Sequence, residues 1–182
     1  MLVLRTPRLL LRSFSPEDEE SLLDFWNDPR VRRYLWDDRP VSRDEVREQL
    51  ALSERDFREQ GYGEFVLALR QWPGVLIGFS GLRRLDGSGE VELLYGLYQN
   101  FWGRGLATEA ARAVLRFGFE EVGLEEILAC ADLDNPASVR VMERLGMSYA
   151  GERRVGSEDP PTTYYRLRRE DFERGHRHEE TE

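Results

Sequence analysis

The stretch "LLYGLYQNFWGRGLATEAARAVLRFGF" (Leu93–Phe119) decides the fold, because a strand-like run passes through a glycine-rich loop directly into an amphipathic helix. The helix is predicted over about residues 106–122, and Gly103 and Gly105 stand just before it. No Ser, Asp or Asn stands directly ahead of the helix to cap it, so the backbone N–H groups of its first turn are left for water or an anion. Phosphate is the usual anion at such a helix start, and Arg104 adds a fixed positive charge.

The same glycines allow two other interpretations. Two glycines can simply make a tight turn between a strand and a helix, with water on the helix end. Gly103-x-Gly105-x-x-Thr108 also resembles part of the dinucleotide-binding fingerprint GxGxxG, but the third glycine is missing and the preceding strands look antiparallel. Gly96, inside the strand pattern, suggests a bulge or the close approach of a ligand.

Capping and turn residues predict further elements around this stretch. Helices are expected over residues 15–28, 28–35, 42–61 and 135–146. Strands are expected over residues 8–14, 63–70, 74–85, 89–98, 125–132, 147–155 and 162–169. Short connections favour antiparallel neighbours, and the only clear βαβ crossover spans Gly89–Asp132. The chain is therefore predicted to be α+β: a single mixed, mostly antiparallel, twisted sheet flanked by helices in residues 1–170, then a polar tail over 171–182 that is frayed over residues 173–182.

The composition excludes several kinds of chemistry. All 26 basic residues are arginine, which excludes a Walker A loop, a Schiff-base lysine and a lysine general base. Cys130 is the single cysteine, which rules out an intrachain disulfide and a thiolate metal cluster and fits a reducing cytoplasm. The two histidines, His176 and His178, suggest no metal site. The formal charge of −9 argues against nucleic acid as the main partner and suits cationic substrates such as amines.

Nothing in the sequence indicates a membrane segment. No apolar run approaches the length of a membrane span. The first residues, "MLVLRTPRLLLRSF", carry scattered arginines and no small-residue cleavage site, so they do not resemble a signal peptide. We therefore expect a cytoplasmic protein with no membrane partner; its oligomeric state is left open, a homodimer included.

Several stretches together resemble one family. The loop reads Trp102-x-x-Gly105-x-Ala107, which resembles the Q/R-x-x-G-x-G/A motif of the GNAT N-acetyltransferases, except that Trp102 replaces Gln or Arg. That tryptophan resembles the W-G-x-G-x-A-T-E pattern of the RimJ/RimL type, the ribosomal-protein N-terminal acetyltransferases. "RTPRLLLRSFSPED", "WNDPRVRRYL", "VELLYGLYQNFWG" and "DNPASVRVMERLGM" resemble further stretches of this subgroup in the same order. The resemblance covers about residues 4–170.

The resemblance implies an enzyme that uses acetyl-CoA and no metal, with the CoA site at the strand–loop–helix. By position, the pyrophosphate would be held by the backbone amides of Gly103, Arg104, Gly105, Leu106, Ala107 and Thr108. The acetyl and pantetheine groups would lie along the backbone of Leu94, Tyr95, Gly96 and Leu97, and Asn135 would contact the pantetheine region. Asn135 also reads as a plain helix cap, and the two roles are compatible.

Glu92 is the candidate general base. Strand alternation places it on one face with Glu90, Leu94 and Gly96, two residues before the segment expected to hold the thioester. We expect apolar neighbours to raise the pKa of its carboxyl towards the working pH. Glu92 also matches the glutamate that many GNAT enzymes use as a base, often through water; a solvated strand glutamate, as expected for Glu90, is the alternative.

The other chemical roles are less sharply indicated. The tyrosine that many GNAT enzymes use to protonate the CoA thiolate is replaced here by Met142. Ser138 matches a serine of the RimJ/RimL-like subgroup and would take that role; an ordinary first-turn serine, with water as the acid, is the alternative. A backbone N–H at Gly96 is expected to stabilise the oxyanion. Cys130 reads as a buried strand residue without an adjacent base.

We therefore expect acetyl transfer from acetyl-CoA directly to a primary amine, with a protein N-terminal α-amino group favoured. The alternatives are a small amine, such as a polyamine, an amino acid or an antibiotic, and a CoA-binding module without catalysis. Aromatic and acidic residues near the start could line a groove for a cationic acceptor, although aromatics at helical spacing usually belong to a core. They are Trp26, Tyr34 and Trp36 with Asp24, Asp28, Asp37 and Asp38.

Overall fold

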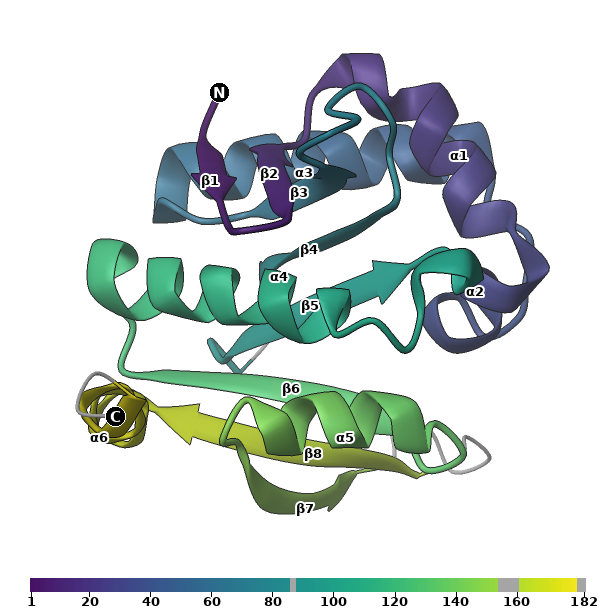
Figure 1. The fold of residues 1–182 in the computed structure, drawn as a ribbon. Coiled ribbons are helices and arrows are strands. Elements are labelled where there is room, and N and C mark those ends of the chain that lie inside the picture. Colours follow the sequence, from purple (N-terminus) through teal and green to yellow (C-terminus); the bar gives the residue numbers. More distant parts are fainter. Residues whose placement is uncertain (86–87, 154–160, 180–182) are drawn as a thin grey trace.

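The computed structural model describes residues 1–85, 88–153 and 161–179 (Figure 1). Its strands are β1 (Val3–Arg5), β2 (Leu9–Ser13), β3 (Glu64–Leu69), β4 (Gly78–Arg84), β5 (Val91–Leu97), β6 (Glu126–Asp132), β7 (Ser148–Arg153) and β8 (Thr162–Arg168). Its α-helices are α1 (Glu19–Asn27), α2 (Pro29–Leu35), α3 (Arg43–Gln60), α4 (Leu106–Arg116), α5 (Pro136–Arg144) and α6 (Arg169–Glu179). Shorter helical turns are η1 (Pro16–Asp18), η2 (Gln99–Phe101) and η3 (Phe117–Val122).

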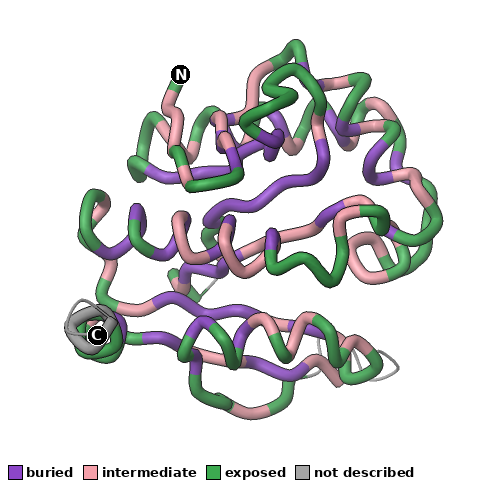
Figure 2. Tube along the Cα trace, in the orientation of Figure 1, coloured by how far each residue is buried: buried purple, intermediate pink, exposed green. Residues whose placement is uncertain are grey.

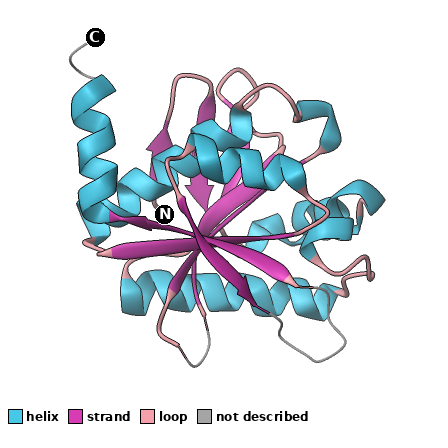
Figure 3. Cartoon of the chain, turned by 90° about the horizontal axis from the view of Figure 1, so that it is seen from below, coloured by secondary structure: helices cyan, strands magenta, loops and turns pink. Residues whose placement is uncertain are grey.

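The strands of the described residues form one sheet in the order β1-β2-β3-β4-β5-β6-β8-β7. Neighbouring strands are antiparallel except β5 and β6, which are parallel because α4 and η3 carry the chain back between them. Figure 3 shows the strands fanned by the twist of the sheet, with helices on both sides. The predicted α+β fold with one mixed, mostly antiparallel sheet is confirmed.

The two faces of the sheet carry separate apolar cores. On one face, α4, α5 and Phe172 of α6 pack against sheet residues such as Leu67 and Leu93. On the other face, α1 to α3 pack against the sheet through residues such as Phe25, which contacts Phe79. Figure 2 shows that burial is concentrated in the middle strands, whereas β7 at the edge is largely exposed. The middle of the sheet is therefore held from both sides.

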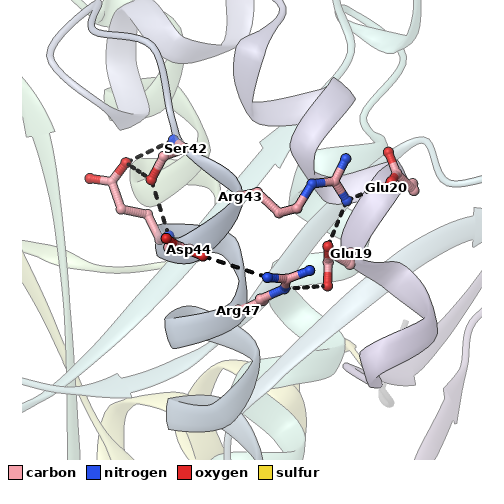
Figure 4. A network of polar contacts seen from close by, with 7 residues as sticks. Glu19, Glu20, Ser42, Arg43, Asp44 and Arg47 are labelled. Atoms are coloured by element: carbon pink, nitrogen blue, oxygen red, sulfur yellow. Dashed lines mark hydrogen bonds and ion pairs between the residues drawn. The ribbon is translucent and has the colours of Figure 1, made fainter.

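Ion pairs join the first half of α3 to α1 (Figure 4). Arg43 Nη1 lies 2.6 Å from Glu19 Oε1 and 2.5 Å from Glu20 Oε1, and Arg47 Nε lies 2.8 Å from Glu19 Oε2. Arg47 also approaches Asp44 of its own helix at 3.5 Å. These side chains are largely solvated, so the pairs orient the two helices more than they stabilise the fold.

Three local expectations differ from the structure. The three-residue β1 was not predicted, because so short a segment shows no alternation. The helix expected over residues 106–122 loses α geometry at Phe117, where η3 forms a π-helical segment ending at Gly123 (φ 87°). The tail expected to fray over residues 173–182 belongs to α6 as far as Glu179, and Phe172, just before it, holds this helix against the core at 5.0 Å from the ring of Phe119. Residues 154–155 of the strand expected over 147–155 lie outside the described residues.

No helix in the described part of the chain is both long enough and apolar enough to cross a membrane.

Candidate active site

Strand β5 is fully paired along one edge and almost unpaired along the other. On the β4 side, every residue from Val91 to Leu97 has a partner, ending with Leu97 opposite Gly78. On the β6 side, within the described residues, only Glu92 is paired, opposite Leu128. Beyond Glu92 no further pair between the two strands is present in the described residues, and we use the term opening for this unpaired edge of β5, which runs from Leu93 to Leu97 towards the glycine loop.

The hydrogen-bond phase of β5 decides which backbone groups face this opening. Leu85 N–H bonds to Glu90 C=O, and Tyr98 N–H bonds to Ile77 C=O, so the even-numbered residues of β5 face β4. The N–H and C=O groups of the odd-numbered Tyr95 therefore point away from β4, as does the N–H of Leu97. A ligand lying in the opening would meet these groups of Tyr95 and Leu97.

Gly96 does not mark a bulge, contrary to expectation. The register with β4 is continuous through the Gly96↔Phe79 pair, and the N–H of Gly96 belongs to that ladder. A Cβ at this position would lie 3.0 Å from Leu35 Cδ1 and 3.1 Å from Phe79 Cε1. Apolar side chains of the α1–α3 face approach Gly96 closely, so a larger residue would have to displace them, and Gly96 is not the free oxyanion donor that the sequence suggested.

The start of α4 has free backbone donors. Gly103 (φ 70°) and Gly105 (φ 72°) are both left-handed, a conformation that glycine adopts without strain. Gly105 takes the N-cap position, where it offers no side chain, and the first helical bond runs from Glu109 N–H to Gly105 C=O at 3.0 Å. Within the described residues, the N–H groups over residues 105–108 have no acceptor. The predicted uncapped helix start is confirmed, and these donors remain available to an anion.

Trp102 joins the loop to the end of β5. Its Nε1 donates to Leu97 C=O at 2.7 Å, while its ring remains 43% exposed. Arg104 lies over the ring of Phe101 at 5.8 Å. The residue that departs from the general GNAT motif therefore fixes the loop relative to the unpaired edge of the strand.

Glu92 is buried at the point where β5 and β6 part, but its surroundings are not apolar. Its Oε2 lies 2.6 Å from Arg83 Nη2, and its Oε1 accepts from Cys130 Sγ at 2.6 Å. The expectation of a carboxyl among apolar neighbours was wrong, because the β4–β5 register places Arg83 directly opposite Glu92. Burial opposes the charge of Arg83, yet attraction to Glu92 outweighs it and raises the pKa of the guanidinium.

Burial also shifts the pKa values of ionisable groups near Glu92. Burial, together with the Glu92 charge, raises the pKa of the Cys130 thiol, so Cys130 is a neutral donor and not a nucleophile. Glu64 of β3 is buried on the same face of the sheet, and burial raises its pKa to about 7 despite attraction to Arg83. Arg83 therefore stands between two buried carboxyl groups.

Ser138 lies in the first turn of α5, capped by Asn135. The Asn135 side chain accepts from Ser138 N–H at 3.2 Å, so its predicted capping role is confirmed. Tyr95 Oη donates to Ser138 C=O at 3.0 Å and lies 2.8 Å from Ser138 Oγ. Burial raises the pKa of Tyr95, so its hydroxyl stays protonated. The tyrosine side chain thus links the unpaired edge of β5 to α5.

The aromatic residues that could have lined an acceptor groove mainly belong to the core, which the sequence pattern favoured. Trp26 is 2% exposed and packs 5.5 Å from the ring of Trp36. Of the acids, Asp28 caps α2 and Asp38 pairs with Arg32 at 3.2 Å. Tyr34 is partly buried, and Asp24 and Asp37 are exposed.

A different acidic group lies at the open end of the strands. Asp132 ends β6, and burial followed by repulsion from Asp134 and Asp37 raises its pKa. Asp134 approaches Arg33 of α2 at 3.6 Å, so α2 and the end of β6 come together. In the part of the chain that the structure describes, no group of His, Cys, Asp and Glu residues could hold a metal ion.

Sequence reasoning missed three residues near this site. Arg83 could have been found by counting outwards from the "DGSG" turn signal of the sequence, since the register of the flanking strands pairs it with Glu92. No local sequence pattern predicts the contacts of the Tyr95 side chain, or the contact of Arg8 with the glycine loop. Both contacts depend on how distant elements pack.

Residues 8–148 match the acetyltransferase (GNAT) domain family. "Putative ribosomal N-acetyltransferase YdaF" from Bacillus subtilis (strain 168) is 30% identical over 154 residues, covering 81% of this chain and 82% of that protein. Spermidine N(1)-acetyltransferase from Escherichia coli (strain K12) is 24% identical over 142 residues, covering 78% and 74% of the two chains.

Among solved structures, the acetyltransferase from Agrobacterium tumefaciens str. C58 has a TM-score of 0.78 at 28% identity, covering 92% of this chain and 94% of that chain. The family match spans both the parted strands and the uncapped helix start. The chain belongs to the GNAT acetyltransferases, enzymes that use acetyl-CoA as the acetyl donor.

Proposed function

We propose that the chain transfers an acetyl group from acetyl-CoA to a primary amine, with a protein N-terminal α-amino group as the preferred acceptor. One observation carries the proposal: the opening beside β5 joins free backbone groups of Tyr95 and Leu97 to free N–H groups at the start of α4. CoA has amides along its pantetheine arm and a pyrophosphate beyond them. The order of donors along the opening suits that molecule.

The binding roles follow this order. The N–H groups of the loop and first helical turn would hold the pyrophosphate, through Gly103, Arg104, Gly105, Leu106, Ala107 and Thr108. The segment Leu94, Tyr95, Gly96 and Leu97 would lie along the acetyl and pantetheine groups, with Tyr95 and Leu97 as its hydrogen-bonding members. Asn135, while capping α5, would border the pantetheine region.

Glu92 would accept the proton that the amine loses, directly or through a water molecule. Arg83 and Cys130 each occupy one of its oxygens. Each carboxylate oxygen has two lone pairs, so acceptor capacity remains for a water or an amine. In this arrangement Arg83 fixes the orientation of the base, while Cys130 holds it on the β6 side.

Two donors would act on the donor thioester. The N–H of Tyr95 or Leu97 would stabilise the oxyanion, because the N–H of Gly96 is engaged with β4. Ser138 Oγ would donate to the leaving thiolate when the Tyr95 hydroxyl donates to Ser138 Oγ in place of Ser138 C=O, since each hydroxyl has one proton. Acetyl-CoA supplies the acetyl thioester, and the residues of the chain align it and supply or accept protons.

The acceptor is inferred from charge and similarity. Asp132, Asp134 and Asp37 place negative charge at the open end of β6, which favours a cationic amine. The relative named as a ribosomal N-acetyltransferase and the Trp102 pattern of the RimJ/RimL type both favour a protein N-terminus. These two similarities support the proposal that the chain belongs to that subgroup.

A polyamine is the second candidate acceptor. The same acidic group supports it, because several carboxylates can pair with several ammonium groups of one molecule. The relative named as a spermidine N(1)-acetyltransferase supports it as well. A peptide that presents one α-amino group can pair with fewer of these carboxylates than a polyamine can.

The test is an acetyl-transfer assay with acetyl-CoA, N-terminal peptides and a panel of polyamines and other small amines, read by CoA release and product mass. We expect the highest kcat/KM with a peptide whose α-amino group is free, and none with the same peptide already acetylated. A preference for a polyamine would replace the acceptor assignment. Binding of CoA without transfer to any amine would indicate a CoA-binding module, and no CoA binding at all would refute the site.

A further inference from the structure

The segment before β2 reaches across to the start of α4, about one hundred residues further along the chain. Thr6 Oγ1 donates to Glu109 Oε1 at 2.5 Å, and Arg8 N–H donates to the same oxygen at 2.9 Å. The Arg8 guanidinium donates through Nε to Glu109 Oε2 at 2.6 Å and through Nη1 to Arg104 C=O at 2.8 Å. One arginine therefore holds both the glycine loop and the first turn of the helix.

The bond to Arg104 sets the direction of the next amide. In a trans peptide, the C=O of Arg104 and the N–H of Gly105 point in opposite directions. Because Arg8 holds that carbonyl towards β2, the Gly105 N–H is turned away from β2. The left-handed conformation of Gly105 then leads into the free N–H groups over residues 106–108. Arg8 thus determines how the first donor of this group is aimed.

The bonds to Glu109 offset a negative charge that lies close to the proposed phosphate site. An acid in the first turn stabilises a helix through its dipole, but it also repels a phosphate bound at the same end. Glu109 is in this position, and its side chain is only 15% exposed. Arg8 and Thr6 together satisfy both of its oxygens, and the positive charge of Arg8 offsets the negative one.

From these contacts we infer that Arg8 is a positioning residue for the phosphate-binding start of α4. It acts through the Arg104–Gly105 peptide and through Glu109, and it does not touch the reacting atoms. The inference rests on the proposed function, since it requires that the pyrophosphate of the donor is bound there. Its consequence is specific: losing Arg8 weakens the binding of a donor that carries the pyrophosphate and leaves a donor without it unaffected.

The experiment compares acetyl-CoA with S-acetyl-pantetheine, which lacks the pyrophosphate and the adenosine. In Arg8→Ala, we expect KM for acetyl-CoA to rise about tenfold with kcat nearly unchanged, because charge-assisted hydrogen bonds orient the loop. The kcat/KM for acetyl-pantetheine should stay within about twofold of the unmodified protein. A merely structural role would instead change both donors alike.

Two further variants separate position from charge. Arg8→Lys keeps the charge, but a single ammonium lacks the planar fork that reaches Glu109 and Arg104 together, so it should lose part of the affinity for acetyl-CoA. Adding Glu109→Gln to Arg8→Ala removes the carboxylate left without its arginine and should recover part of that affinity. The matched control is Arg70→Ala, which removes an exposed arginine bonded to Thr6 C=O at 3.3 Å and should leave both donors unchanged.

The outcomes distinguish the inference from the proposed function. If the unmodified protein used both donors equally well, the pyrophosphate site itself would be refuted. If it preferred acetyl-CoA, but Arg8→Ala kept that preference in full, only the role of Arg8 would be overturned. Affinity equal to that of the unmodified protein in Arg8→Lys would also overturn positioning, since charge alone would then suffice. Melting temperatures of each variant show whether it is folded before its kinetics are read.

Discussion

The two edges of β5 use the same seven residues for opposite purposes. Towards β4, the ladder is continuous from Val91 to Leu97, and glycines let the backbones approach where side chains would collide. Towards β6, a single pair at Glu92 holds the strands together before they part. The closed edge secures the position of β5 in the sheet, and this makes it possible to leave the polar backbone groups of the other edge free for a ligand.

The candidate site residues lie where the paired and unpaired edges of β5 meet. In the described residues, backbone donors and acceptors of β5 that would normally bond to a neighbouring strand are unpaired between Glu92 and the glycine loop. Glu92 lies at the junction, with Arg83 from the closed side and Cys130 from the β6 side. Changes on the closed edge should therefore lower stability, whereas changes around the open edge should lower binding or rate.

The largest expected effect is on the closed edge. A Cβ on Gly78 would lie 2.1 Å from Gly96 C=O, a backbone atom that cannot move without opening the ladder. Gly78→Ala should therefore reduce the free energy of unfolding by about 3–5 kcal/mol or prevent folding. Urea unfolding measures this, with Gly74→Ala as the control, because nothing lies within 4 Å of a Cβ there. Equal stability of the two variants would contradict the close approach.

The next effect is at the glycine loop on the open side. Gly105→Asp places negative charge on the free N–H groups and should weaken acetyl-CoA binding by at least about 100-fold. Gly105→Asn is the matched control, because it is nearly the same shape, tolerates the left-handed conformation and carries no charge. Calorimetric titration with acetyl-CoA compares the two. Similar affinities in both variants would contradict an anion site at this helix start.

Some of this contrast could be predicted from the sequence. The strand, the glycine loop and the uncapped helix are consecutive, so local patterns revealed them, and the order of elements gave the α+β sheet. Asn135 was identified as a cap for the same reason, because capping needs only the residues of one turn. What could be predicted is the part of the molecule that neighbouring residues determine.

The rest depends on contacts between distant segments. Gly96 was misinterpreted because the side chains that pack closely against it come from α2 and β4, and Glu92 because its partners come from β4 and β6. The bonds between Arg8 and Glu109 cross about one hundred residues. In each case the chemical type of the residue was visible in the sequence, whereas its partner was determined by strand register or helix packing.

The third prediction concerns the junction of the two edges. Glu92→Gln keeps the shape of the side chain but removes the proposed base. The kcat at pH 7 should therefore fall about 100-fold, which is the smallest loss typical of removing a general base. The rate should then rise at higher pH, where more of the amine is already deprotonated. Glu90→Gln is the control, since it removes the other glutamate of this strand region, which pairs with Arg153 and has no proposed role in the reaction. An unchanged pH–rate profile in Glu92→Gln would remove Glu92 from the mechanism.

The fourth prediction uses pH to compare the two carboxyl groups beside Arg83. Glu64, on the closed side, has its pKa raised from 4.5 to about 7 by burial, against attraction to Arg83 and with repulsion from Asp56 and Glu92. Between pH 4.5 and 7 the folded state therefore holds a proton that the unfolded state has released, and stability falls as the pH rises through this window.

The neutral Glu64→Gln variant escapes this loss. At pH 8 it should be about 2 kcal/mol more stable than the unmodified protein, and at pH 4 the difference should nearly vanish, because Glu64 is then protonated in both states. Urea unfolding at the two pH values checks this. Glu48→Gln, at an exposed position of α3, controls for the loss of a negative charge. A gain in stability that is the same at both pH values would show that the Glu64 charge is not its cause.

The smallest expected effect is at the link across the open edge. Tyr95→Phe keeps the ring packed but removes the hydroxyl that contacts Ser138 C=O and Oγ. If that hydroxyl orients Ser138 towards the thiolate, kcat should fall about fivefold while KM for acetyl-CoA changes little, since the backbone of Tyr95 still lines the opening. Ser138→Ala should lower kcat at least as much, and the double variant should add nothing further, because both changes remove one donor. Additive losses in the double variant would mean that Tyr95 and Ser138 act separately, and that the hydroxyl joins β5 to α5 without serving the leaving group.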